Sequence, residues 1–488
     1  MSDRPHIIIF NPDQWRADVM GHFGNPAAIT PNLDKLVESD AVSFQNAFCQ
    51  NPVCTPSRCS FMTGWYPHVR GHRTMFHMLQ PDEPVLLKYL KDGGYFVWWG
   101  GKNDLVPAQN GYDDYCDVKY KAQRDLRPNL HSVQEWRGDP DGDNYYSFFA
   151  GQLDVGGDDV YYDNDWAMVY GAIEQIKNAP PDQPLCIYLP LSYPHPPYGV
   201  EDPWFTQIER DKLPDRTPTP NWENKPKLIA GIYERQRLQN WTEDRWDELR
   251  ATYYGMCARV DAQFGMVMDA LREANMYDES AVFFFSDHGD FTGDYGLVEK
   301  TQNTFEDCLT NVPFIIKPPA TIKIQAGIRD ALVELIDFTA TVFDITDIDP
   351  DYDMFGQSLL PLIAGETDQH RDAVFCEGGR RVGEEQAMEK DSPSFSDPRE
   401  LYFPRVQLQG REDGSHSKAT MCRTDKFKYV RRLYELDELY DLEADPRELH
   451  NVINDPQYAG VLANLRERML EWYQETSDVI PRKTDKRS

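Results

Sequence analysis

Long apolar runs are missing from this chain of 488 residues, and basic residues are scarce relative to acidic ones. No stretch reaches the roughly 18 consecutive apolar residues that a membrane-spanning helix needs, so the sequence predicts neither a membrane span nor a membrane partner. The first apolar run, at residues 7–10, is also much shorter than the core of a secretory signal peptide. We therefore expect a cytoplasmic protein.

The deficit of positive charge excludes one class of partner. Lysine and arginine number 50 against 81 aspartates and glutamates, which gives a formal net charge of −31. Because binding to nucleic acid needs a basic surface, we expect no nucleic-acid partner. The nine cysteines are an odd number and include no Cys-x-x-Cys pair, which argues against a disulfide framework or a zinc knuckle and favours reduced thiols.

The apolar residues that are present predict an α/β fold. Continuous apolar runs are typical of strands buried on both faces of a sheet, and they occur at residues 7–10, 95–99, 185–191 and 281–285. Helical spacing predicts helices at residues 86–92, 165–177, 246–275 and 329–345. The chain should therefore contain a large sheet flanked by helices.

The pattern changes after about residue 370. Short alternating segments at residues 373–376, 419–423, 428–431 and 438–441 predict an antiparallel sheet, and residues 456–476 predict a closing amphipathic helix. We therefore expect a larger N-terminal domain at residues 1–369. A smaller C-terminal subdomain, in which the antiparallel sheet packs with a helix, should occupy residues 370–488.

The stretch around Cys54 is the hardest to interpret as scaffolding. Cys54 is followed by Pro56 and then by Arg58, one helical turn away, so the thiol and the guanidinium would lie side by side. Pro56 suits the first turn of a helix, whose free N–H groups attract anions. A guanidinium binds a tetrahedral oxyanion through two parallel hydrogen bonds. The pattern predicts a nucleophile at a helix N-terminus, with Arg58 as an anion clamp.

Polar residues follow two of the predicted strands where each strand ends. Asp13 and Gln14 come after the first strand, and Asp287 and His288 come after the last of the four. Ligands of α/β sheets bind at the carboxyl ends of strands, and hard divalent cations prefer oxygen ligands. Three side chains with oxygen ligands and one imidazole admit Ca²⁺, Mg²⁺ or Mn²⁺.

The motif Cys54-Thr55-Pro56-Ser57-Arg58, with Thr63-Gly64 after it, resembles the signature of type I sulfatases, which belong to the alkaline phosphatase-like superfamily. In that family a maturation enzyme oxidises the cysteine to Cα-formylglycine, and the hydrate of this aldehyde is the nucleophile. The resemblance therefore implies formylglycine at position 54 and a formylglycine-generating enzyme as partner. One departure is Trp65, where many members have arginine.

The resemblance extends from about residue 5 to residue 475. It implies the alkaline phosphatase-like fold, a large mixed sheet flanked by helices with a C-terminal antiparallel sheet, and makes residues 1–369 the catalytic domain. It also implies one metal site, usually for Ca²⁺, with these ligands: Asp13, Gln14, Cys54, Asp287 and His288.

The same resemblance implies roles for further residues. Lys102 and Lys300 match the two lysines that contact the sulfate. His195 lies in a Pro-His-x-Pro element and matches the histidine that contacts the sulfate and protonates the leaving group. Asp104 stands where many members have a histidine that helps to release sulfate from the enzyme. Either Asp104 or His72 would take over this proton transfer.

The resemblance implies a sulfuric ester hydrolase whose substrate is a small sulfate monoester of a sugar or an aryl alcohol. Gln14 keeps a second reaction open, because an Asp-Gln pair also occurs in relatives that hydrolyse phosphonate monoesters or phosphodiesters. A third hypothesis is a non-catalytic member of the family that binds a sulfated ligand. The polar segments 105–165, 201–245 and 380–416 should determine the substrate, and the last one could instead form a subunit contact in a homo-oligomer. The negative net charge disfavours long sulfated polyanions.

Overall fold

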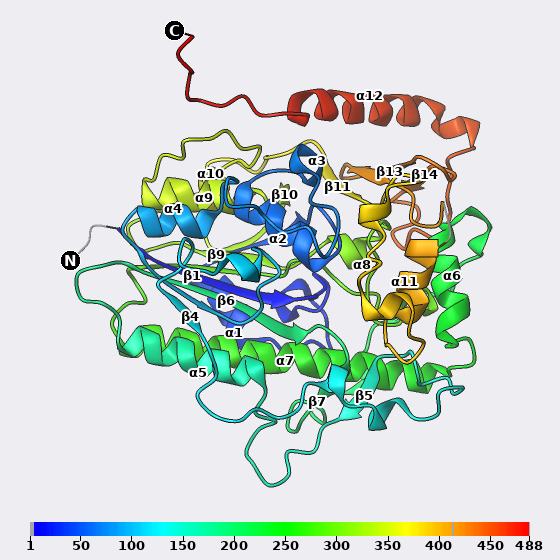
Figure 1. The fold of residues 1–488 in the computed structure, drawn as a ribbon, viewed down its shortest axis with the longest axis horizontal. Coiled ribbons are helices and arrows are strands. Elements are labelled where there is room, and N and C mark those ends of the chain that lie inside the picture. Colours follow the sequence, from blue (N-terminus) through cyan, green and yellow to red (C-terminus); the bar gives the residue numbers. More distant parts are fainter. Residues whose placement is uncertain (1–3, 412–413, 488) are drawn as a thin grey trace.

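The fold is built on a mixed sheet of eight strands in the order β10-β2-β9-β8-β1-β6-β3-β4 (Figure 1). It is seen in a computed structural model that describes residues 4–411 and 414–487. The strands are β1 His6–Asp13, β2 Val42–Phe48, β3 Phe96–Gly100, β4 Val118–Tyr120, β6 Leu185–Pro194, β8 Ser280–Phe285, β9 Phe314–Lys317 and β10 Gly327–Glu334. The four predicted apolar runs form β1, β3, β6 and β8.

The centre of the sheet is parallel. β1 pairs in parallel with β6 on one side and with β8 on the other, while β3 runs parallel to β6. Only β9 is antiparallel to its neighbours, β8 and β2. Because β1, β3, β6 and β8 all run the same way, their carboxyl ends meet at one edge of the sheet.

Two apolar layers enclose this sheet. Ile8 and Phe10 of β1 pack into the layer formed with α1 Pro31–Ser39, α5 Asn164–Lys177 and α7 Glu243–Glu273. Ile7 and Ile9 point to the opposite layer, formed with α2 Cys54–Thr63, α4 Leu86–Asp92 and α9 Asp337–Thr346. Figure 1 shows α5 and α7 below the sheet and α4 and α9 above it. This two-sided burial explains why β1 is a continuous apolar run.

The C-terminal part forms a second, antiparallel sheet, as predicted. Its strands, in the order β11-β12-β13-β14, are Val374–Gly378, Ala419–Arg423, Phe427–Arg432 and Glu438–Asp441. The closing helix α12 Ala459–Thr476 packs on them, with the rings of Phe375 and Trp472 stacked at 4.4 Å between centroids. The division of the chain at residues 369 and 370 stays a prediction.

The segments between these elements contain further structure. The remaining helices are α3 Pro67–Arg70, α6 Lys227–Gln236, α8 Asp307–Thr310, α10 Leu360–Ile363 and α11 Phe403–Arg411, and the two-stranded sheet pairs β5 Phe149–Gln152 with β7 Tyr198–Val200. In the described part of the chain, no helix combines the length and the apolar character that crossing a membrane requires. All nine cysteines are free thiols, and all but Cys308 are buried.

The helix predicted at residues 329–345 is wrong in its first half. Residues 327–334 form β10, which pairs in parallel with β2 at the edge of the sheet, and the helix α9 begins only at Asp337. Without this pairing the outer edge of β2 would expose unpaired N–H and C=O groups. Partners that lie far apart in the sequence thus override the local helical spacing.

Candidate active site

Side chains from the carboxyl ends of the parallel strands converge at one edge of the sheet. Asp13 ends β1, Lys102 follows β3 and Asp287 follows β8, while His195 follows β6. The helix α2 begins at this edge with Cys54, which is 1% exposed. The structure therefore brings together residues that the sequence placed at separate strand ends.

Four of the predicted metal ligands form a compact group. The carboxylate oxygens of Asp13 and Asp287, the Cys54 Sγ and a ring nitrogen of His288 all lie within 4.8 Å of one another. The Cys54 Sγ is 3.3 Å from the His288 Nε2 and 3.6 Å from the Asp13 Oδ1. Ligands at about 2.3–2.6 Å from a Ca²⁺ ion stand about 3–5 Å from each other, so the residues fit such a cation. All four side chains are buried.

Gln14, the fifth predicted ligand, lies at the border of this group. Its amide Oε1 accepts a hydrogen bond from the Lys300 Nζ at 2.6 Å, and its Nε2 donates to Asp290. Its backbone N–H donates to the Asp287 Oδ1 at 3.1 Å, with φ at +71°. A left-handed backbone is uncommon outside glycine and is typical of functional sites. Gln14 therefore links Lys300 to the cation-ligand group.

Arg58 has a different position from the one that the sequence predicted. The side chain is wholly buried, and its guanidinium contacts Asp13 at 3.0 Å and Asp287 at 2.8 Å. A further guanidinium nitrogen donates to the Asn11 Oδ1 at 2.9 Å and to the Tyr188 hydroxyl. With its donors directed to these partners, Arg58 holds the two carboxylates in place instead of clamping an anion beside Cys54.

Lys102 and Asp104 form an ion pair at the border of the group. The Lys102 Nζ lies 2.7 Å from the Asp13 Oδ2, 3.0 Å from the Asp104 Oδ2 and 3.9 Å from the Cys54 Sγ. Burial acts to raise the pKa of Asp104, but Lys102 and Arg58 hold that pKa below its ordinary value, so the group is a carboxylate at neutral pH. Burial and the charge of Asp13 raise the pKa of the Cys54 thiol.

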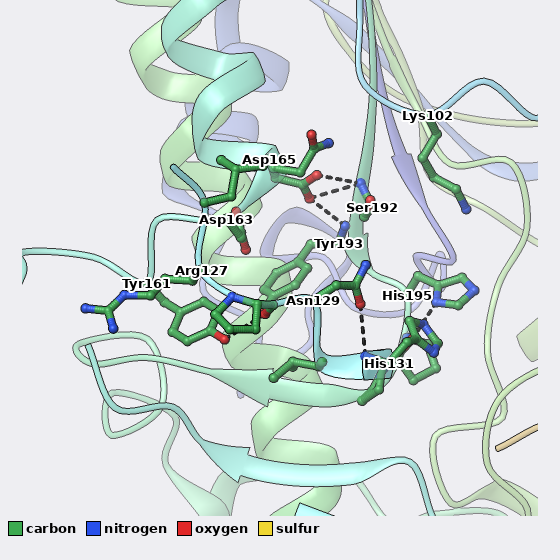
Figure 2. A pocket seen from close by; sticks show the side chains of 16 residues that line it. Lys102, Arg127, Asn129, His131, Tyr161, Asp163, Asp165, Ser192, Tyr193 and His195 are labelled. Carbon is green, nitrogen blue, oxygen red and sulfur yellow. Dashed lines mark hydrogen bonds between the residues drawn. The ribbon is translucent and has the colours of Figure 1, made fainter. Parts of the chain in front are cut away.

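A cavity of about 460 Å³ opens beside Lys102 and His195. Figure 2 shows these two side chains at one end and Arg127 and Tyr161 at the other. Its walls come largely from the segment 105–165, through residues 126–131, Tyr161 and residues 163–165. The cavity thus leads from the sheet edge to the polar insertion.

His195 is held by groups from three parts of the chain. Its Nδ1 lies 2.5 Å from the carbonyl oxygen of Pro196, so this nitrogen carries a proton, because a carbonyl only accepts. Its Nε2 lies 3.5 Å from the hydroxyl of Tyr402 and 4.0 Å from the Glu299 Oε1. Burial and the charge of Lys300 lower the pKa of His195 well below its ordinary value.

His72 does not join this group of contacts. Its Nε2 is 3.0 Å from the carboxylate of Glu83, and its Nδ1 is 2.9 Å from the carbonyl oxygen of His77. Both ring nitrogens are therefore engaged in a neighbouring loop. Asp104 and His72 were the two residues predicted to take a proton during the release of sulfate. Of these two, only Asp104 contacts the residues around Cys54.

Several residues of the site escaped the sequence analysis. Glu299 binds the Lys300 Nζ at 2.8 Å, and Asp290 accepts hydrogen bonds from Tyr198 and Gln14. Glu299 precedes the predicted Lys300, and Asp290 follows the predicted Asp287 and His288. This proximity in the sequence was the signal that could have identified both residues. Tyr402 had no such signal, because it comes from the irregular segment 380–416.

The comparisons with known proteins identify the family of this chain. Residues 5–348 match the family model described as Sulfatase, and residues 399–475 match the one described as N-sulphoglucosamine sulphohydrolase, C-terminal. The chain belongs to the sulfatase family. This sulfatase lies within the alkaline phosphatase-like superfamily, as its motif indicated, and is an enzyme for sulfate ester hydrolysis.

Its relatives are distant but match along most of the chain. Arylsulfatase K of Gallus gallus is 24% identical over 474 residues, which cover 92% of this chain and 79% of the relative. An arylsulfatase of Clostridium perfringens is 25% identical over 499 residues, which cover 96% of this chain and 94% of the relative. Among solved structures, the phosphonate monoester hydrolase of Agrobacterium radiobacter has a TM-score of 0.75 at 21% identity, covering 97% of this chain and 96% of that chain.

The position of Arg58 leads to a prediction about stability and metal content. Arg58→Lys keeps the charge but loses most of the directed hydrogen bonds to Asp13 and Asp287, so we expect a loss of about 3 kcal/mol in the free energy of unfolding. Elemental analysis of the purified variant should also show less bound divalent cation.

The control for this variant is Arg399→Lys. The Arg399 side chain is 82% exposed and pairs with Asp397 at 2.7 Å on the surface, so its replacement should leave the free energy of unfolding close to the wild-type value. Equal stability and equal metal content in the two variants would contradict the role given to Arg58.

Proposed function

We propose that this sulfatase hydrolyses a small sulfate monoester of a sugar or an aryl alcohol with the side chain at position 54 as nucleophile, after oxidation of Cys54 to formylglycine. The observation that supports this most is the meeting of Cys54 with Asp13, Asp287 and His288 at the sheet edge. A maturation enzyme is the proposed partner that supplies the oxidation.

The proposed cation site comprises Asp13, Gln14, Asp287 and His288, with position 54 beside them. A divalent cation held by these residues, Ca²⁺ by analogy with the family, would supply positive charge for the sulfuryl oxygens and would make a hydroxyl at position 54 more acidic. The buried Arg58 keeps the two carboxylates at the spacing that such a cation needs.

Lys102 and Lys300 are the proposed contacts to the sulfuryl oxygens. Their ammonium groups lie on two sides of the group, Lys102 against Asp13 and Lys300 against Gln14. Fixed positive charges in a buried site stabilise the charge that develops on the transferred group, with little reorganisation during the reaction. Both charges are kept in place by carboxylates, Asp104 and Glu299.

His195 is the proposed proton donor to the leaving oxygen. Its Nδ1 proton is held by the carbonyl of Pro196, which leaves the Nε2 as the nitrogen that takes up and releases the second proton. Glu299 and Tyr402 lie next to this Nε2 and can accept its proton in a hydrogen bond once the ring is charged, against the opposing effect of burial and Lys300. Asp104, a carboxylate at neutral pH, is the proposed base for the later release of sulfate.

Hydrolysis of a phosphonate monoester or a phosphodiester is the second candidate. It is favoured by Gln14 and His288, since an Asp-Gln pair also occurs in relatives that hydrolyse such esters, and by the shared fold of the phosphonate monoester hydrolase of Agrobacterium radiobacter. Sulfate monoesters and these phosphorus esters have the same single negative charge and tetrahedral shape.

The nucleophile can be tested by replacing Cys54. Cys54→Ala should abolish hydrolysis of 4-nitrophenyl sulfate, and intact mass of the native protein should show formylglycine in place of cysteine at position 54. Cys59→Ala, five residues further along the same helix and also buried, is the matched control and should keep its turnover. Full activity of Cys54→Ala would rule out the proposal, and an unmodified Cys54 in active enzyme would rule out formylglycine.

The two candidate reactions can be separated by parallel assays on one preparation. We expect kcat/KM for 4-nitrophenyl sulfate to exceed that for a nitrophenyl phosphonate monoester by at least about tenfold, because the chain belongs to the sulfatase family. The reverse order of the two values would favour the second candidate.

The role of His195 can be tested through Tyr402. Tyr402→Phe removes the hydroxyl beside the Nε2 but keeps the ring, so the ratio of kcat/KM for an alkyl sulfate to that for 4-nitrophenyl sulfate should fall about tenfold. The alkoxide needs a proton on leaving and the nitrophenolate does not. Tyr146→Phe, which also loses a buried hydroxyl contact, at 2.7 Å to the Pro398 carbonyl, should keep the ratio. An unchanged ratio in Tyr402→Phe would contradict the assignment.

A further inference from the structure

A second cavity, of about 400 Å³, adjoins the cavity at His195. The two share residues 126–128 as a common wall. This wall is fixed, because the Arg127 N–H donates to the Tyr162 carbonyl at 2.8 Å and the Tyr161 hydroxyl donates to the Pro128 carbonyl at 2.9 Å. A ligand that fills the first cavity and extends past these residues therefore reaches the second cavity over a preformed boundary.

The second cavity has an aromatic floor. The rings of Tyr162 and Tyr170 stack at 6.2 Å between centroids, with 21° between their planes. The guanidinium of Arg124 lies over Tyr162 at 3.3 Å from the ring centroid. Tyr170, on the helix α5, is 42% exposed. Because Arg124 covers one face of Tyr162, the exposed ring of Tyr170 is the flat surface on which the C–H face of a pyranose ring can pack.

The polar groups of this cavity are of both signs. Arg127 pairs with Asp158 at 2.6 Å, which neutralises both charges. Arg124 stacks on Tyr162, and across the described ranges 4–411 and 414–487 no oxygen accepts a hydrogen bond from its guanidinium. Asp125 and Asp159 also line the cavity. Its formal charge is therefore negative, on a protein of net charge −31.

This combination selects a kind of ligand. Sugar hydroxyl groups both donate and accept, so a mixture of guanidinium and carboxylate groups satisfies them. A carboxylate or a second sulfate would meet the surplus of negative charge, which disfavours it. The floor and the charges together suit a sugar ring that has hydroxyl groups and no charge.

We propose that the second cavity is a subsite for an uncharged sugar unit, so that the substrate is a sulfated di- or oligosaccharide whose sulfated unit occupies the cavity at His195. This inference rests on the proposed sulfatase function and narrows its substrate class. It places Arg124 and Tyr170 as specificity-determining residues outside the reacting groups.

Three substrates test this subsite: a sulfated monosaccharide, the same unit linked to a neutral hexose, and the same unit linked to a hexuronate. For the wild-type enzyme we expect the highest kcat/KM with the neutral disaccharide. In Tyr170→Ala or Arg124→Ala, its advantage over the monosaccharide should shrink about tenfold, mainly through KM. Asp159→Asn should reduce the preference for the neutral over the hexuronate disaccharide about threefold.

The matched control is Tyr434→Ala. Tyr434 is 44% exposed, close to the value for Tyr170, but it lies between β13 and β14 of the C-terminal sheet. This variant should keep the wild-type ratio of the two kcat/KM values. An equal effect of Tyr170→Ala on monosaccharide and disaccharide, or a wild-type preference for the hexuronate compound, would overturn the inference.

A binding measurement separates this inference from the proposed function. Calorimetry with the desulfated neutral disaccharide should give about tenfold weaker binding to Tyr170→Ala than to the wild-type enzyme, whether or not any sulfate ester is turned over. If none of the sulfated substrates is hydrolysed, the proposed function fails. Equal binding of the disaccharide to both proteins would refute the subsite itself.

Discussion

Two buried carboxylates held by one guanidinium are the constraint on which the rest of the site depends. Asp13 and Asp287 end neighbouring strands and are fully buried, so they would repel each other strongly without compensation. Arg58 contacts both within about 3 Å. Because Arg58 and Cys54 belong to the same helix, the pairing that neutralises the carboxylates also fixes Cys54 beside them.

The sheet provides the other half of this arrangement. Parallel pairing of β1 with β6 and β8 brings three chain segments that are far apart in the sequence to one edge. The apolar layers on both faces fix the strands, so the polar side chains just beyond their ends have little freedom. Precise placement of charge in such a site is what electrostatic stabilisation of a transition state requires.

The sequence predicted the parts of the fold and site that depend on local patterns. Buried strands are apolar on every residue, so β1, β3, β6 and β8 were recognisable, as were the polar residues that follow them. The role of Arg58 was not predictable, since its partners come from β1 and β8 and only the neighbourhood along the helix is visible in the sequence. Tyr402 lies in a segment without periodicity, and β10 depends on a strand that precedes it by more than 200 residues. Contacts of such long range leave no trace in one sequence.

The wall at residues 126–128 belongs to an insertion, and it is held by contacts within that insertion, such as those of Arg127 with Asp158 and of Tyr161 with Pro128. The reacting groups, in contrast, are fixed by the sheet and by α2. Under the proposed function, selectivity and chemistry therefore belong to separate pieces of the polypeptide. Divergence of the insertion could then change which molecules are admitted while the groups at the sheet edge stay in place.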